Sequence, residues 1–269
     1  MDERLTIATL DSPGCPVGNR IGSFIASGVS SELDIASTVT HNLSKGLALL
    51  ESGDADVLAL PAELIHGNMM EILKSGCKVV GARTPVRPYP VLVSDNKIQY
   101  QPKSAILLCS NKLTRRQLRR SRRGLRVLDP EAFASIEEKG DVPSDPVLRA
   151  KWMEDLRGMG EIDGFVISRG VYDRANLVGR RHSLLPDGLN EGDPDFLPPA
   201  YSDLIVLLAR NRFPNSISKE ISEKEGETCW WVQNSMLGSL DLEMLEKIGA
   251  LVRHRQVRSL IKQAEATRD

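Results

Sequence analysis

The residues with the clearest chemical potential lie in one basic run, KLTRRQLRRSRRGLR, at residues 112–126. It holds seven arginines and one lysine, while the whole chain has a net charge of −1. An apolar segment and a short polar turn precede the run, in the order expected for strand, turn and helix. Helix N-termini and arginines at the carboxyl end of a strand bind carboxylates and phosphates well. We therefore expect an anion site here, drawing on Ser110, Arg115, Arg116 and Arg126.

Two other interpretations of the basic run stay open. Most charge runs on helices are solvated faces, and this one could be another. Nucleic-acid contact is disfavoured, because no aromatic residues alternate with the arginines to stack on bases.

Composition limits the classes of protein that remain. The chain has 269 residues, of which 41% are hydrophobic, and this is enough for two domains. No CxxC pair or histidine spacing suggests a metal site, and the scattered cysteines suit a reducing compartment. No signal peptide or membrane-spanning run is evident. We expect a cytoplasmic protein without a metal or membrane contact, and a monomer.

Strand-like and helix-like segments alternate through the first hundred residues, which predicts an α/β unit. A polar stretch at 95–103 predicts a crossing into a second such unit, and a proline-rich stretch at 186–199 predicts the return. The predicted fold is α/β: two hinged lobes of the periplasmic-binding-protein-like (type 2) kind with a central cleft, plus a short C-terminal helical segment. The expected parts are a first lobe of 1–97 plus 198–215, a second lobe of 98–197, and a C-terminal part of 216–269.

Several segments in collinear order resemble the porphobilinogen deaminase (hydroxymethylbilane synthase) family. LTIATLDSP is similar to the family's opening strand and RxSPLA turn, and the turn that starts at Ser110 is similar to its SSLRR turn. The other similar segments are LLESGDADV at 49–57, GEIDGFVI at 160–167 and FLPPAYSDLIV at 196–206.

This resemblance implies an enzyme of tetrapyrrole (haem) biosynthesis that condenses porphobilinogen to hydroxymethylbilane on a dipyrromethane cofactor. The ligand would be a polycarboxylate, porphobilinogen or a polypyrrole, held by cationic and hydroxyl side chains lining the cleft. Residues 216–269 would be the remnant of the family's third domain. Beyond the residues of the basic run and its turn, the expected substrate-binding residues are Ser12, Lys45, Arg83 and Arg87.

The chain departs from the family at its catalytic motif. The HSxKD motif reads LPAEL at residues 60–64, so Leu64 stands where the catalytic aspartate belongs. Glu63 is the one nearby carboxylate that could substitute for it. Cys229 lacks the glycine partners of the family's cofactor-binding cysteine, and Cys15, in the turn Gly14-Cys15-Pro16, is an equally weak candidate. Two alternatives follow: a non-catalytic protein of the same fold that holds a polycarboxylate or tetrapyrrole intermediate, or a small-molecule lyase of the solute-binding type.

Overall fold

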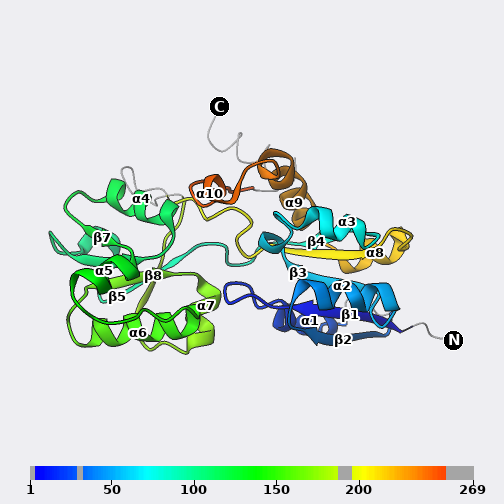
Figure 1. The fold of residues 1–269 in the computed structure, drawn as a ribbon, viewed down its shortest axis with the longest axis horizontal. Coiled ribbons are helices and arrows are strands. Elements are labelled where there is room, and N and C mark those ends of the chain that lie inside the picture. The colour runs from blue at the N-terminus through cyan, green and yellow to red at the C-terminus, as the bar shows by residue number, and fades with distance from the viewer. Residues whose placement is uncertain (1–3, 29–32, 187–195, 253–269) are drawn as a thin grey trace, which may run out of the picture.

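The computed structural model describes residues 4–28, 33–186 and 196–252, which form two α/β lobes side by side (Figure 1). Each lobe is built on one five-stranded sheet, with strand orders β2-β1-β3-β10-β4 and β7-β6-β8-β5-β9. None of the helices in these ranges is long and apolar enough to cross a lipid bilayer.

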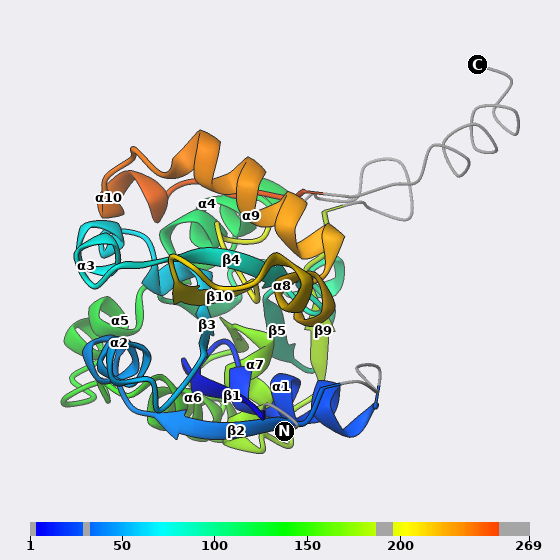
Figure 2. The same cartoon turned by 90° about the vertical axis from the view of Figure 1, so that its right-hand side faces the viewer.

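The first lobe contains the N-terminal strands and helices together with the chain that returns from the second lobe (Figure 2). Its strands are β1 (Leu5–Leu10), β2 (Ile35–Thr40), β3 (Val57–Pro61), β4 (Cys77–Arg83) and β10 (Ile205–Arg210). Its helices are α1 (Val17–Ala26), α2 (Leu43–Ser52), the 3-10 turn η1 (Ala62–Leu64), α3 (Met69–Lys74), α8 (Asn215–Ile221) and α9 (Lys224–Leu237).

The second lobe is formed by the middle of the chain. Its strands are β5 (Val91–Ser94), β6 (Ile106–Cys109), β7 (Arg126–Leu128), β8 (Gly164–Ile167) and β9 (Arg181–Ser183). Its helices are the 3-10 turn η2 (Ile98–Tyr100), α4 (Lys112–Ser121), α5 (Pro130–Ile136), α6 (Pro146–Gly158) and α7 (Arg169–Ala175). The short helix α10 (Leu242–Leu245) follows α9 near the end of the described chain.

Each sheet contains one antiparallel strand, supplied by the chain just after it crosses between lobes. In the first lobe β10 runs antiparallel to both β3 and β4. In the second lobe β5 runs antiparallel to both β8 and β9. The chain therefore crosses between the two lobes twice. The predicted type 2 periplasmic-binding-protein-like fold class is confirmed.

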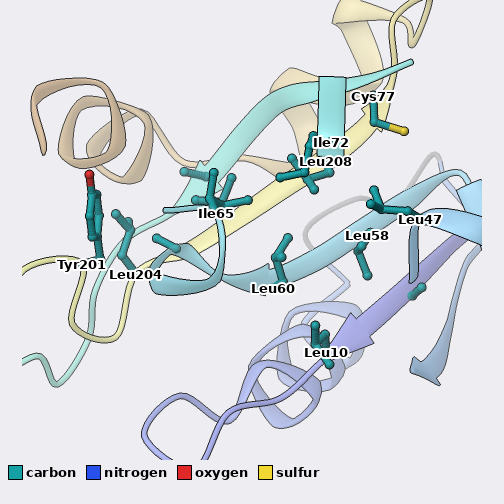
Figure 3. Close-up of a cluster of buried hydrophobic side chains, with 14 of the residues drawn as sticks. Leu10, Leu47, Leu58, Leu60, Ile65, Ile72, Cys77, Tyr201, Leu204 and Leu208 are labelled. Carbon is teal, nitrogen blue, oxygen red and sulfur yellow. The ribbon is translucent and has the colours of Figure 1, made fainter. Parts of the chain in front are cut away.

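Strand β3 shows how the first lobe is held together. Leu58 and Leu60 point into a cluster on one face of the sheet, where Ile72 of α3 and Leu208 of β10 also pack (Figure 3). The alternate residues, such as Val57, point into the cluster on the other face. A strand buried on both faces needs an unbroken apolar sequence, and VLALP provides one.

The predicted boundary between the lobes is wrong by about one strand. Residues 91–94 were expected in the first lobe, but β5 pairs with β8 and β9 of the second sheet. The first crossing is therefore the proline-rich stretch at 84–90, and the polar stretch at 95–103 lies inside the second lobe. Short apolar strands such as VLVS do not reveal their pairing partner from local sequence.

The C-terminal part is not a separate remnant of a third domain. Helices α8 and α9 pack on the first sheet, and a Cβ on Gly226 of α9 would lie 2.5 Å from the carbonyl carbon of Arg83 in β4. Beyond α10 the chain lies beside the second crossing, where the Ala250 amide donates to the Pro198 carbonyl (3.0 Å). The predicted C-terminal helical segment is thus α8 to α10 within the described residues, and residues 253–269 lie outside them.

Candidate ligand-binding cleft

Four strands direct their carboxyl ends toward one cavity of about 400 Å³ between the lobes. They are the parallel pair β1 and β3 of the first sheet and the parallel pair β6 and β8 of the second. Gly14 and Cys15 follow β1, and Glu63 follows β3. Ser110 follows β6, and Ser168 follows β8. Ligands of open α/β sheets bind in the crevice at such strand ends, so this cavity is the candidate site.

Most of the remaining wall is apolar. Prolines and aliphatic side chains from both crossings and from α6 and α7 leave few polar groups in contact with a ligand. Such a wall buries the body of a small molecule, while a few polar groups fix its orientation. The apolar lining includes Pro61, Pro88, Pro90, Pro146, Met153, Val166, Val171 and Pro199.

Arg149 of α6 is the one basic side chain among the described residues that line the cavity. Its Nη1 donates to the Ser110 hydroxyl oxygen (3.3 Å), and its Nε donates to the Pro143 carbonyl (2.9 Å). Its Nη2 forms an ion pair with Glu131 (3.3 Å), and its side chain is 21% exposed. Nη2 also donates to the Ser144 carbonyl (3.5 Å), so one N–H, on Nη1, is left for an anionic ligand group.

A pair of carboxyl groups lies behind this wall. The pKa of Glu131 is raised, first by its hydrogen bond with the Asp129 carboxyl and then by burial. The pKa of Asp129 is lowered, because the hydrogen bond with Glu131 and the charge of Arg115 outweigh the opposing effect of its burial.

Arg115 does not contact the cavity, contrary to the prediction. Its Nη1 pairs with Asp129 and donates to the carbonyls of Cys109 (2.8 Å) and Ser110 (2.9 Å). Arg115 therefore fixes the turn that carries Ser110, and its charge is neutralised by the ion pair with Asp129.

Asp203, two residues before β10, connects the two crossings. Its Oδ2 accepts from the amides of Val86 (2.8 Å) and Arg87 (2.7 Å). Arg20 of α1 donates to the Asp203 carbonyl (2.8 Å) and lies 3.3 Å from Oδ1. These contacts fix the position of both crossings at the floor of the cleft.

Glu63 lies on the first-lobe wall, across the cleft from the second-lobe residue Arg149. Its carboxylate makes no hydrogen bond or ion pair with any residue that the structure describes. It is therefore free to accept a hydrogen bond from a ligand. Of the predicted site residues, Glu63 and Ser110 are the two that the structure brings together at the cavity, along with Cys15.

The remaining predicted cationic residues lie away from the cavity. Arg87 is on the first crossing and pairs with Asp173 of α7 (3.3 Å), while Lys45 is exposed in α2. Arg116 and Arg126 are exposed on the second lobe. The comb of arginines expected for a polycarboxylate is thus absent from the described lining of the cavity. Ser12 is buried beside the cavity, and its hydroxyl has no hydrogen-bond partner within the described structure.

Arg83 also fails as a cleft residue, because it is committed inside the first lobe. Its Nη2 pairs with Glu223 (2.5 Å), its Nη1 donates to the Ile221 carbonyl (2.9 Å), and its guanidinium lies 4.1 Å from the centre of the Phe24 ring. Burial lowers the pKa of Arg83, while the charge of Glu223 acts against that shift. This pair joins β4 to the start of α9.

Replacing Glu223 with glutamine should destabilise the fold in a pH-dependent way. Burial raises the pKa of Glu223, but the Thr84 amide and the charges of Arg83 and Arg20 outweigh it, so the net pKa lies below the ordinary 4.5. The stabilisation is therefore present above pH 4.5 and is lost as pH falls through the folded-state pKa. We expect Glu223→Gln to cost about 1–2 kcal/mol at pH 7, a modest value because Glu223 is partly exposed.

Urea unfolding at pH 7 and at successively lower pH would measure this effect. The difference between wild type and Glu223→Gln should shrink once the pH is below 4.5. Glu220→Gln on α8, an exposed glutamate without an ion pair in the described structure, is the matched control and should change little. A difference that stays constant across the acid range would show that the charge of Glu223 is not what matters.

The cysteines at the cavity are not activated nucleophiles. Cys15 and Cys109 line it but are buried. Burial raises the pKa of the Cys109 thiol to about 12, and burial also raises the pKa of the Cys15 thiol well above its ordinary value. Cys229, a residue of α9, is also buried, and desolvation raises its pKa. A thiol must be deprotonated to act as a nucleophile, so these three are inert at neutral pH. Within the described ranges no His, Cys, Asp and Glu side chains cluster as metal ligands.

Three residues of the site were missed from the sequence. Ser168 directly follows β8, so the rule about strand ends could have identified it. Arg149 lies in the first turn of a helix announced by Asp145-Pro146, but its direction into the cleft depends on how α6 packs. Asp203 adopts φ 54°, and no local pattern marked it as the contact between the crossings.

Comparison with known proteins agrees with the architecture. The chain matches no family model and no curated protein. Among solved structures it is similar to a periplasmic substrate-binding protein of an ABC transporter from Coxiella burnetii (13% identity, TM-score 0.38, 87% of this chain and 97% of that one). It is also similar to immunogenic lipoprotein A from Vibrio vulnificus (12% identity, TM-score 0.41, 85% of this chain and 99% of that one). A third similar structure is the ligand-binding component of an ABC-type import system from Staphylococcus aureus (12% identity, TM-score 0.41, 98% of this chain and 84% of that one). The similarity to these three structures is one of fold alone.

The resemblance to porphobilinogen deaminases is therefore wrong. No family model matches the chain, and the similar structures named above are binding proteins and a lipoprotein. The matching segments are the strand ends and glycine turns of a two-lobed scaffold, so collinear order alone was misleading. The expectation of tetrapyrrole biosynthesis falls with it.

The expected cytoplasmic location is contradicted by the same comparison. The similar structures include a lipoprotein and a periplasmic substrate-binding protein. The widely spaced cysteines that suggested a reducing compartment are all buried, as cysteines are in many proteins, so their spacing carried little information.

Proposed function

We propose that this chain is a non-catalytic binding protein whose lobes enclose one small polar molecule. The observation that carries the proposal is the cavity between the lobes, where four strand ends converge and Arg149 is held beside Ser110. The buried, protonated thiols at its wall support binding over covalent chemistry.

The cavity also indicates a class of ligand. Arg149 and the Ser110 hydroxyl would bind one acid group, and Glu63 would accept a hydrogen bond from an amine or hydroxyl on the other side. The apolar walls would cover a short chain or a single ring, which suits a cavity of about 400 Å³. A single anion anchor favours a ligand with one carboxylate over a polypyrrole with many.

Replacing Arg149 with glutamine should weaken binding of such ligands. The loss of a charge-assisted hydrogen-bonding pair corresponds to roughly a ten- to hundredfold increase in Kd. A panel of small monocarboxylates, amino acids and their neutral amides would be screened by thermal shift, and the hits measured by calorimetry. Acids that stabilise the wild type should fail on Arg149→Gln, and their amides should fail on both proteins.

The matched control is Arg157→Gln, the same change on the same helix. Arg157 pairs with Glu154 (2.8 Å) and Asp95 (3.0 Å) and does not line the cavity, so its replacement should leave Kd unchanged. Equal affinity of an acid for wild type and Arg149→Gln, or a preference for amides over acids, would refute the proposed site.

A further inference from the structure

The arginines of the basic run that do not reach the cleft lie on the second lobe, and most of them are exposed. Leu113 and Leu118 of α4 pack inward, so the opposite side of the helix carries its charges into solvent. Helix α4 lies on one face of the second sheet, and α6 and α7 lie on the other (Figure 1). We define the basic face as Arg116, Arg119, Arg120, Arg122, Arg123 and Arg126, with Lys97 and Lys103 nearby in the chain around η2.

The positive charge of this face is not neutralised within the described part of the chain. None of its six arginines forms an ion pair there, whereas Lys112 and Arg115 at the start of the same helix pair with Glu246 and Asp129. Six unpaired guanidinium groups repel one another, and a polyanion would remove that repulsion. The chain as a whole does not attract a polyanion, because its net charge is −1, so any such attraction must come from the basic face.

Several of these side chains are already ordered for binding. Arg119 donates from Nη2 to the Val127 carbonyl (2.5 Å), and Arg122 donates from Nη1 to the Gln99 carbonyl. Each bond leaves other N–H groups of the same guanidinium directed to solvent. Arg116 and Arg120 are four residues apart on α4, with Arg119 beside them, so they form a short row about one helical turn of ~5.4 Å long, and Arg123 lies just beyond the end of the helix at Ser121. Arginines in such a row suit the repeated phosphates of a nucleic-acid strand.

The structure also supplies the aromatic residue that the basic run lacks. The bond from Arg122 to the Gln99 carbonyl places η2 against the end of α4, and the next residue, Tyr100, is 73% exposed. An exposed ring beside ordered arginines is a stacking platform for an unpaired base. A membrane surface fits less well, because the apolar residues of α4 face the sheet and none is available for insertion.

We propose that this face binds single-stranded nucleic acid, with the arginines contacting phosphates and Tyr100 stacking on a base. The proposal goes beyond the cleft and does not depend on what the cleft binds. The probes are fluorescein-labelled oligo(U) and oligo(dT) of 20 nucleotides, measured by anisotropy over a series of salt concentrations. Affinity for both should fall steeply with salt, with a log–log slope of about −0.7 for each phosphate contacted.

Two variants test the two parts of the face. Arg120→Gln combined with Arg123→Gln should reduce the size of the slope by about 1.4, and Tyr100→Ala should weaken binding about tenfold at one salt concentration. Lys74→Gln with Lys78→Gln on the first lobe removes the same charge from exposed, unpaired lysines and should change neither property. Tyr100→Phe, which keeps the ring, should restore the affinity lost in Tyr100→Ala.

Three outcomes would overturn the proposal. One is failure of the wild type to bind either oligonucleotide at 50 mM salt. Another is an equal loss in the lysine control, which would show non-specific attraction by total charge. The third is tight binding to vesicles containing phosphatidylserine without binding to oligonucleotides, which would assign the face to a membrane. Circular dichroism and the thermal midpoint of each variant would confirm that the fold is retained.

Discussion

An alanine at Gly170 should hold the two lobes apart. Gly170 lies in the first turn of α7, and a Cβ there would be 2.3 Å from the carbonyl oxygen and 2.7 Å from the carbonyl carbon of Gly14 in the other lobe. These are backbone atoms, so no change of rotamer can relieve the overlap. The loop that carries Gly14 is also fixed, because Asp11 accepts from the Gly18 amide (2.8 Å) and pairs with Arg174 of α7 (3.2 Å).

The clash can be relieved only if the lobes move apart or the loop is displaced. Opening of the lobes separates Glu63 from Arg149, and displacement of the loop removes the wall formed by Gly14 and Cys15, so in either case we expect affinity for a cleft ligand to fall roughly ten- to hundredfold. The lobes themselves should stay folded, with a thermal midpoint close to that of the wild type. Small-angle scattering should show a larger radius of gyration for Gly170→Ala than for the wild type.

Gly158→Ala at the end of α6 is the control for this experiment. A Cβ at Gly158 has no neighbour within 4 Å, so this variant should match the wild type in both radius and affinity. Gly14→Ala is an intermediate case, because its Cβ would meet the Ser168 hydroxyl oxygen at 3.3 Å and a side chain can move. If Gly170→Ala leaves the radius and the affinity unchanged, the contact between the lobes is not a determinant of closure.

The fold could be predicted from sequence wherever local pattern and burial agree. Strands such as LTIATL and VLALP are apolar runs bounded by turn residues, and the structure buries them on both faces. What local pattern could not give was pairing. The strand at 91–94 has the same composition as its neighbours in the chain, but its partners lie about 75 and 90 residues further on, in β8 and β9.

The site could be predicted only where a residue directly follows a strand. Ser110 and Glu63 reach the cavity for that reason, and the same rule would have given Ser168. Arg83 is the last residue of β4, but its guanidinium is paired with Glu223, which lies 140 residues away in sequence. The charge of an arginine is visible in a sequence, whereas the carboxylate that neutralises it is not.

The same limitation applies to the arginines of the basic run at residues 112–126. Sequence alone suggested that its arginines would line a cleft and that it had no aromatic companion. In the fold, Leu113 and Leu118 of α4 pack inward, the basic residues of the helix other than Arg115 are exposed, and η2 brings Tyr100 to the end of the helix. Both corrections come from packing between segments that are distant in the linear pattern.

An alanine at Gly226 should destabilise the first lobe as a whole. Gly226 is in the first turn of α9, and its Cβ would lie 2.5 Å from the carbonyl carbon of Arg83, 2.7 Å from the Thr84 nitrogen and 2.8 Å from the Ala82 carbonyl carbon. The helix would have to move away from β4 and would loosen the Arg83–Glu223 pair. Overpacking of this kind costs roughly 1–3 kcal/mol, and the loss of the pair adds to it, so we expect about 3 kcal/mol.

Gly22→Ala in α1, where a Cβ meets nothing within 4 Å, should instead stabilise by about 0.5–1 kcal/mol. Urea unfolding followed by fluorescence would compare the two variants with the wild type. If α9 belongs to the first lobe, Gly226→Ala should shift the main transition; an unchanged main transition preceded by a separate early step would make α9 an independent unit.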